Sequence, residues 1–300
     1  MPAAQKVEHV QMGVRDLEEA LQFYTEAMGL TELARSEGIV YIGAGRDGNY
    51  DMAVTEDDTG IDHFAIRVSN SDTIETYETR LSEHDVSTER ADGAEPSQEH
   101  GLRFALPSGI HMELVTVEDV DYQHSDEIAV PGRGGVAPLD LDHLTYLTPD
   151  LRTDAEFLRD HLDFKITEVI GTDENWEGAF TRRGDFHHDV ALFTPPETDA
   201  DHVGLHHVGW KMANIEHMKL FIDSIAQAGV GLEFGIGRHY GGDGIYAYFQ
   251  EPGGNRFELA AEMATIDVDT TRYTDPDEYI SAWGDVLVPE SFDAGSGIVT

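Results

Sequence analysis

The stretch LHHVGW (residues 205–210) decides the fold, because three related stretches precede it: VEHVQM (7–12), IDHFAI (61–66) and LDHLTY (141–146). In each of them a histidine stands among alternating apolar residues, which is the two-residue period of a half-buried β-strand. Recurrence at a spacing of roughly 50 to 80 residues is typical of a repeated structural unit. The sequence therefore predicts four similar modules, each beginning with a histidine-bearing strand.

Each of these strands is followed by a helix signal and then by shorter strand signals. Residues that can cap a helix precede apolar positions at helical spacing from Asp16, Asp72, Thr153 and Asn214 onward. Alternating apolar patterns then predict strands at residues 40–44, 51–54, 102–106, 111–115, 177–182, 188–193, 246–250 and 256–260. Each module is thus predicted to contain a strand, a helix and about three further strands, which makes an α+β fold.

The length of the chain suits two domains, each with its own core. We expect an N-terminal domain at residues 1–120 and a C-terminal domain at 139–265. The stretch between them, 121–138, is rich in Gly, Pro and acidic residues and is predicted to be a linker. Residues 266–300 lie outside the repeat and are expected to pack as a tail.

Composition excludes several classes of protein. The chain has no cysteine, so disulfides and thiolate ligands are excluded. Its net charge of −40 disfavours nucleic acid as a partner, because phosphate would be repelled. The start of the chain has no apolar segment of the secretory type, and no apolar run approaches the ~20 residues of a membrane span. We therefore expect a soluble, cytoplasmic protein without a membrane partner.

Two Gly-x-x-x-Glu-Leu motifs complete a recurring set of possible metal ligands. They end in the pairs Glu113–Leu114 and Glu258–Leu259. Each half of the chain thus holds two histidines and one carboxylate: His9, His63 and Glu113, then His143, His207 and Glu258. Such a set on one face of a metal leaves other positions open, as in non-haem Fe(II) oxygenases, and the same ligand types suit Mn(II).

The second half offers two adjacent histidines for one ligand position. Neighbouring residues of a strand point to opposite faces, so His206 and His207 cannot both face the metal. Alignment of LHHVGW with LDHLTY selects His207. We expect His206 to be a supporting or packing residue.

Essentially the whole chain resembles the vicinal oxygen chelate superfamily and, within it, the extradiol catechol 2,3-dioxygenases. The motifs that carry the resemblance are HVQMGVRD (9–16), PSGIHMELV (107–115), LDHLTY (141–146), HHDVALF (187–193), GLHHVGW (204–210), GRHY (237–240) and YFQEPGGNRFEL (248–259). The resemblance implies that each domain folds two βαβββ modules into an open barrel and that the C-terminal domain holds Fe(II). It also implies a catechol and O2 as substrates, a 2-hydroxymuconic semialdehyde as product, and a homo-oligomer such as a tetramer.

The resemblance assigns roles to three more residues. His188 matches a histidine that faces the O2 site and delivers a proton there. His239 matches a histidine that contacts the substrate and shapes its access. Tyr248 matches a tyrosine that hydrogen-bonds a substrate oxygen. His187, the neighbour of His188, is expected to face the other way.

The N-terminal set lacks these supporting residues. Aligning NYDMAV with HHDVAL places Tyr50 at the position of His188. Counting back from the glutamate places Arg103 at the position of Tyr248. A cationic arginine beside a dication is electrostatically unfavourable. The N-terminal domain is therefore predicted to be vestigial and to hold no catalytic iron.

Two other classes of function stay open at this stage. A glyoxalase-like lyase or isomerase would need a metal and a carboxylate base, but would not need His188, His239 and Tyr248 together. A metal-free small-molecule-binding protein of the same fold would not need the ligand set. Oxygen consumption separates the first class from a dioxygenase, and bound metal in the purified protein argues against the second.

The net charge of −40, which is spread along the chain, fits a protein adapted to a halophile's cytoplasm and predicts that its stability depends on salt. Excess negative charge repels itself in dilute buffer, whereas at about 1 M salt the Debye length is only ~3 Å. We expect the midpoint of thermal unfolding to rise strongly between about 0.1 M and 2 M KCl, as measured by circular dichroism. A midpoint that stays flat over this range would remove the inference that the chain is adapted to a halophile's cytoplasm.

Overall fold

The computed structural model of the chain describes residues 6–45, 47–118, 135–276, 281–284 and 288–299. Most of the linker predicted at 121–138 lies outside these ranges. The N-terminal half contains β1 (Val7–Val14), α1 (Leu17–Gln22), the π-helix η1 (Phe23–Ala27), β2 (Thr31–Ser36), β3 (Ile39–Gly43), β4 (Met52–Glu56), β5 (Gly60–Arg67), α2 (Ser71–Glu83), β6 (Thr88–Arg90), β7 (Gln98–Ala105) and β8 (His111–Val117).

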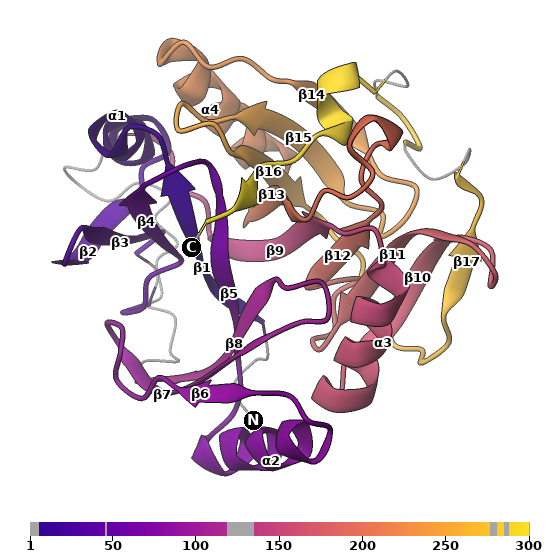
Figure 1. Cartoon of the computed structure of the whole chain (residues 1–300). Helices are drawn as coiled ribbons and strands as arrows, with labels where there is room; N and C mark the ends of the chain where they lie inside the picture. The colour runs from indigo at the N-terminus through magenta and orange to yellow at the C-terminus, as the bar shows by residue number, and fades with distance from the viewer. Residues whose placement is uncertain (1–5, 46, 119–134, 277–280, 285–287, 300) are drawn as a thin grey trace.

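The C-terminal half repeats this order, as Figure 1 shows. It contains β9 (Asp140–Leu147), α3 (Leu151–Leu162), β10 (Lys165–Gly171), β11 (Trp176–Arg182), β12 (Val190–Phe193), the 3-10 helix η2 (Glu197–Asp199), β13 (Gly204–Lys211), α4 (Ile215–Gln227), β14 (Phe234–Arg238), β15 (Ile245–Gln250) and β16 (Arg256–Ala261).

Each half forms one sheet with the first strands of its two modules at the centre. In the N-terminal sheet β1 and β5 pair antiparallel, while β4 lies parallel to β1 and β8 lies parallel to β5. In the C-terminal sheet β9 and β13 pair antiparallel, flanked by the parallel strands β12 and β16. The order of the remaining strands places β2 and β6 at the edges of the first sheet. The predicted fold, four βαβββ modules paired in two domains, is confirmed.

One face of both sheets packs on the helices and builds a common apolar core. Trp210 of β13 and Phe257 of β16 are among its fully buried members. The helices of the two halves also meet each other, because α2 contacts α3 and η1 contacts α4. At the second contact Ser224 Oγ donates to the carbonyl oxygen of Ala27 at 2.7 Å. The other face of the sheets holds smaller apolar clusters and two groups of buried histidines and glutamates.

Two helix caps differ from the predicted ones. Helix α2 begins after Asn70 and α3 after Asp150, and each of these side chains accepts an N–H from the first turn. The predicted caps Asp72 and Thr153 lie inside those first turns instead. Asn70 and Asp150 stand just outside the helix, where the side chain can reach the N–H three residues on, whereas the backbone of the predicted residues is already helical. Two other caps are as predicted: Asp16 and Asn214. None of the described helices has the length and apolar character of a membrane span.

The tail joins both sheets. Strand β17 (Arg272–Thr274) extends the C-terminal sheet by pairing with β10, and β18 (Gly297–Ile298) pairs with β5 of the N-terminal sheet. Between them lies the 3-10 helix η3 (Glu290–Asp293). Figure 1 places the C-terminus between the two halves of the molecule. The tail therefore crosses from one domain to the other and passes the C-terminal sheet on its way.

Candidate metal centre

Gly209, on the central strand β13, organises the residues around it. It pairs with His143 on β9 and with Glu258 on β16, so these two side chains flank it. His207 precedes Gly209 by two residues and lies on the same face of the strand. A methyl group on Gly209 would approach the His143 ring to 2.4 Å, so this position has room for glycine alone. Three neighbouring strands thus bring His143, His207 and Glu258 to one point.

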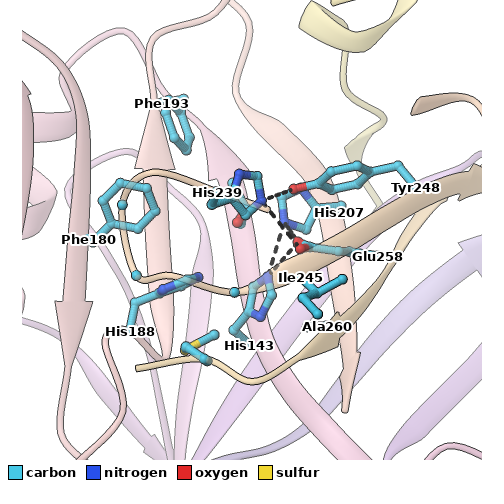
Figure 2. Close-up of a pocket in the computed structure, with 15 residues that line it drawn as sticks. His143, Phe180, His188, Phe193, His207, His239, Ile245, Tyr248, Glu258 and Ala260 are labelled. Carbon is cyan, nitrogen blue, oxygen red and sulfur yellow. Dashed lines mark hydrogen bonds and ion pairs between the residues drawn. The ribbon is translucent and has the colours of Figure 1, made fainter. Parts of the chain in front are cut away.

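The ligand atoms of this group lie at distances that suit one metal ion. His143 Nε2 is 2.9 Å from Glu258 Oε2 and 3.2 Å from His207 Nε2. His207 Nε2 is 3.0 Å from the same carboxylate oxygen. Ligand atoms about 2.1 Å from a common ion and at right angles to each other are about 3 Å apart. The donor set, which is buried, therefore fits a divalent cation (Figure 2).

In the absence of a metal ion, a proton would balance the charge of this group. Burial alone would lower the pKa of His143, but the carboxylates of Glu258 and Asp142 raise it to about 10. Burial lowers the pKa of His207 to about 4. Burial would raise the pKa of Glu258, yet the adjacent histidines hold it well below its usual range. A divalent ion takes the place of the His143 proton, so its binding should release about one proton.

Both histidines of the group have polar partners on their far side. His143 Nδ1 lies 3.0 Å from Asp142 Oδ2, and His207 Nδ1 lies 2.5 Å from His206 Nδ1. Contacts of this kind fix the tautomer and the ring orientation of a metal-binding histidine. His206 Nε2 in turn lies 2.7 Å from the carbonyl oxygen of Phe292, so the tail supports the site through His206.

The contact between His206 and His207 departs from strict strand alternation. Neighbouring residues of a regular strand point to opposite faces and their rings would not meet. The pairing of β13 with β9 has a register shift between Leu205 and His207, which bends the strand locally. His206 therefore reaches its neighbour's ring.

The three residues named from the resemblance line a narrow inner cavity around the group. The His188 ring centroid is 4.5 Å from that of His143. Tyr248 pairs with Glu258 across β15 and β16. His239 Nε2 lies 3.0 Å from Tyr248 Oη and 3.6 Å from Glu258 Oε1. Figure 2 shows His188 on one side of the group and His239 with Tyr248 on the other.

A larger cavity of about 560 Å³ adjoins the inner one. The two share Phe193, His207, His239 and Tyr248 as wall residues. The large apolar residues of the outer wall are Leu147, Ile170, Phe193, Phe234, Val288 and Phe292. The charged residues that line it are acidic: Glu177, Glu197 and Asp293. The outer cavity is thus mainly apolar with a negative rim.

The N-terminal half brings its own predicted set together. His9, His63 and Glu113 meet at the equivalent strand positions, joined by Glu95 from the loop before β7. Sequence reasoning missed Glu95, because no repeated motif includes this loop. The histidine nitrogens lie 3.4 Å apart, and they are 3.6 and 3.4 Å from Glu113 Oε2. Ala65 takes the place of Gly209 between His9 and Glu113. This group is looser than the C-terminal one.

Arg103 and Tyr50 lie where the alignment predicts them. Arg103 pairs with Glu113 across β7 and β8, as Tyr248 pairs with Glu258. Its guanidinium contacts Glu95 and lies 3.4 Å from Glu113 Oε2. Tyr50 Oη lies 3.1 Å from His9 Nε2. The N-terminal group therefore already contains a fixed cation beside its two carboxylates.

Paired βαβββ modules with two histidines and a glutamate on the central strands define a metal-centre fold of the vicinal oxygen chelate type. The chain belongs to the Glyoxalase/Bleomycin resistance protein/Dioxygenase superfamily, whose model matches residues 6–124 and 140–259. The two matched regions correspond to the two halves of the structure. Members of this superfamily differ in reaction, so membership alone leaves the chemistry open.

Curated relatives cover most of the chain. The manganese-dependent 2,3-dihydroxybiphenyl 1,2-dioxygenase of Geobacillus genomosp. 3 is 24% identical over 269 residues, which is 85% of this chain and 84% of the relative. The metapyrocatechase of Pseudomonas sp. (strain CF600) is 27% identical over 261 residues, 84% of each chain. Among solved structures, the 2,3-dioxygenase LapB from Pseudomonas sp. KL28 has a TM-score of 0.79 at 26% identity, covering 91% of this chain and 99% of LapB.

The register at Gly209 predicts that its substitution disturbs the metal site. Gly209→Ala should lower the affinity for Mn(II) by about 10-fold or more, because the added methyl displaces the His143 ring. Isothermal titration of metal-free protein with Mn(II) measures this. Gly231→Ala is the matched control, since a methyl there meets no atom within 4 Å. Equal affinities of the two variants would contradict the packing argument.

Proposed function

We propose that the protein is an extradiol ring-cleaving dioxygenase, in which His143, His207 and Glu258 hold Fe(II) or Mn(II). The observation that carries this proposal is the convergence of a buried two-histidine, one-carboxylate set with His188, His239 and Tyr248 around one cavity. Dioxygenase names among relatives that span most of the chain support it. The ligand types suit both metals.

The bound metal would chelate both oxygens of a catechol and supply the electronic link between the diol and O2. The side chains around it would orient the ring and move protons. Tyr248 and His239, which lie within hydrogen-bond distance of each other, face the space where one diol oxygen would lie. They would hold that oxygen and fix the direction of the ring.

His188 would handle protons on the other side of the group. Burial, together with the neighbouring His143, lowers the pKa of His188 well below its usual range, so its imidazole is neutral. A neutral imidazole at the cavity wall can accept a proton from a diol hydroxyl and return it later to oxygen. The cleaved ring bond would lie beside the diol and not between its hydroxyls, giving a 2-hydroxymuconic semialdehyde.

The outer cavity would take the substituent of the substrate. Its described wall contains no lysine or arginine, and residues 273–300 of the sequence contain neither. A carboxylate placed there would meet acidic side chains and no counter-ion, at a large desolvation cost. We infer that the substrates are catechols with an uncharged, mainly apolar substituent.

The isomerase alternative fits the inner cavity less well. Such a reaction needs a carboxylate base that is free to take a substrate proton. Glu258 is the one carboxylate among the described residues that line this cavity, and it is engaged by His143 and His207. A metal-free binding protein has no use for three buried ligands that converge on one point.

Ring cleavage is tested by O2 uptake with the protein loaded with Fe(II) or Mn(II) under argon. We expect uptake of about one O2 per catechol consumed and the yellow colour of the semialdehyde. 4-Methylcatechol should have a kcat/KM at least about 10-fold above that of 3,4-dihydroxybenzoate. His207→Ala should lose metal and activity together, by more than the roughly 100-fold effect of removing a supporting residue. No O2 uptake with either metal would contradict the proposal.

We propose further that the N-terminal group is a structural remnant in which Arg103 takes the place of a metal ion. Burial would lower the pKa of His9, yet the hydrogen bonds that His9 donates to Glu113 and Glu95 raise it to about 9, so His9 is also cationic. Two glutamates thus face an arginine and a protonated histidine. A dication added to this group would meet positive charge at short range.

The N-terminal proposal predicts metal content as well as activity. His9→Ala should keep about one metal ion per chain and nearly unchanged turnover, while its thermal stability falls because buried glutamates lose a partner. Elemental analysis of dialysed protein gives the metal content. Two ions per wild-type chain, or a loss of turnover in a well-folded His9→Ala variant, would place function in the N-terminal half.

A further inference from the structure

His187 lies against His188, although the sequence suggested that it faces away. The two Nδ1 atoms are 3.1 Å apart and the rings are perpendicular. Both residues precede β12, which begins at Val190, so strand alternation does not apply to them. The other nitrogen of His187, Nε2, lies 2.9 Å from Glu168 Oε2. His188, His187 and Glu168 therefore form a chain of contacts that begins at the inner cavity.

Glu168 is held as a carboxylate at the far end of this chain of contacts. It lies on β10 opposite Arg272 of the tail strand β17, whose Nε is 3.7 Å from Glu168 Oε1. Thr274 Oγ1 donates to the same carboxylate oxygen. Burial would raise the pKa of Glu168, but the hydrogen bonds from His187 and Thr274 lower it overall. An ionised carboxylate can only accept hydrogen bonds.

Backbone packing fixes the His187 ring between its two partners. A methyl group on Gly242 would come within 2.9 Å of His187 Nδ1, and one on Gly241 within 3.0 Å of Glu168 Oε2. His187 N–H donates to the carbonyl oxygen of Ala264 at 2.9 Å. A separate cavity of about 470 Å³, lined by His187 and Glu168, lies behind the pair. The ring is closely packed against Gly242, and its far side borders a second cavity.

For a neutral His187, these contacts imply where the hydrogens lie. Glu168 accepts the Nε2–H of His187, so the Nδ1 of a neutral His187 carries a lone pair. The short contact with His188 then requires that His188 donates its Nδ1–H. The Nε2 of His188 is left without a hydrogen, and His188 lines the inner cavity. The other tautomer of a neutral His187 would leave Glu168 facing a bare ring nitrogen.

We propose that Glu168 and His187 are a positioning pair that sets the tautomer of His188, so that its Nε2 is free to accept a proton in the inner cavity. This inference rests on the proposed function for the use of that proton. When His188 Nε2 takes a proton from a diol hydroxyl, the Nδ1–H can pass to His187 Nδ1. His188 then keeps a hydrogen on Nε2 and becomes a donor, while the imidazolium of His187 faces Glu168. The pair thus converts His188 from an acceptor to a donor without a net change in its charge.

Histidine tautomers can be read directly by ¹⁵N NMR. We would use ¹⁵N-histidine-labelled protein loaded with Zn(II), which is diamagnetic and redox-inert. Wild-type His188 should carry its hydrogen on Nδ1. His187→Leu removes the acceptor, so the hydrogen should move to Nε2, the nitrogen that a free imidazole prefers. His187→Asn keeps an acceptor near the Nδ1 position and should restore the wild-type tautomer. This readout does not depend on turnover.

Kinetics on the iron-loaded variants give the second readout. His187→Leu should lower kcat by about 10–100-fold with little change in KM, and His187→Asn should recover most of the loss. Glu168→Leu should match His187→Leu, and the double variant should be no slower than either, because both residues act through His188. His161→Leu, on α3, is the control for loss of a histidine and should leave kcat unchanged.

Two results would overturn the proposal: a wild-type His188 with its hydrogen on Nε2, or a His187→Leu variant with unchanged tautomer and kcat. Failure of the proposed function is distinguishable from both. In that case the wild-type protein consumes no O2 with catechols, while the NMR spectra still decide whether the pair sets the tautomer.

Discussion

The site depends on the strand register at Gly209. His143 and Glu258 lie opposite this glycine on the two neighbouring strands, and His207 lies two residues before it. A slip of one residue would turn every side chain of a strand to the other face. The register is held by the core, because Val208 and Phe257, next to these residues along their strands, are fully buried on the helix side. The apolar core therefore positions the polar site. Along each strand the apolar residues pack against the helices, and the polar residues between them form the site.

The two halves of the molecule balance buried carboxylates in different ways. In the C-terminal half one glutamate faces two histidines and an open cavity, so a proton on His143 or a divalent ion can complete the charge. In the N-terminal half two glutamates face Arg103 and His9. A buried carboxylate without a positive partner is costly, so each half needs some cation. The same fold thus leaves room for an exchangeable cation in the C-terminal half, whereas in the N-terminal half the side chain of Arg103 is the cation.

The repeat in the sequence predicted four modules with a recurring set of possible ligands, and the family resemblance added their pairing into two domains and the place of the metal site. Histidines on the first strands of two paired modules, with a glutamate on the last strand of the second of them, come together when those strands are neighbours at the centre of a sheet. What escaped prediction lies where the chain departs from regular strands. The bulge before His207 brings His206 into contact with it, and the irregular segment before β12 brings His187 to His188. Neither contact follows from a two-residue period.

Other parts of the site come from segments that no pattern links to it. Glu95 lies in a loop, and the carbonyl oxygen of Phe292 comes from the tail. Thr274 reaches Glu168 because β17 joins the edge of the sheet, which no short-range signal announces. The sequence therefore predicts which residues can bind a metal, whereas the structure reveals what orients them.

The central claim is that one metal ion binds between β9, β13 and β16 and that the N-terminal group binds none. Anomalous X-ray scattering from crystals soaked in Mn(II) tests it most directly. The account predicts one strong peak per chain, about 2.1 Å from ligand atoms of His143, His207 and Glu258. A peak at His9, His63 and Glu113, or an empty C-terminal site in crystals that hold manganese elsewhere, would contradict it.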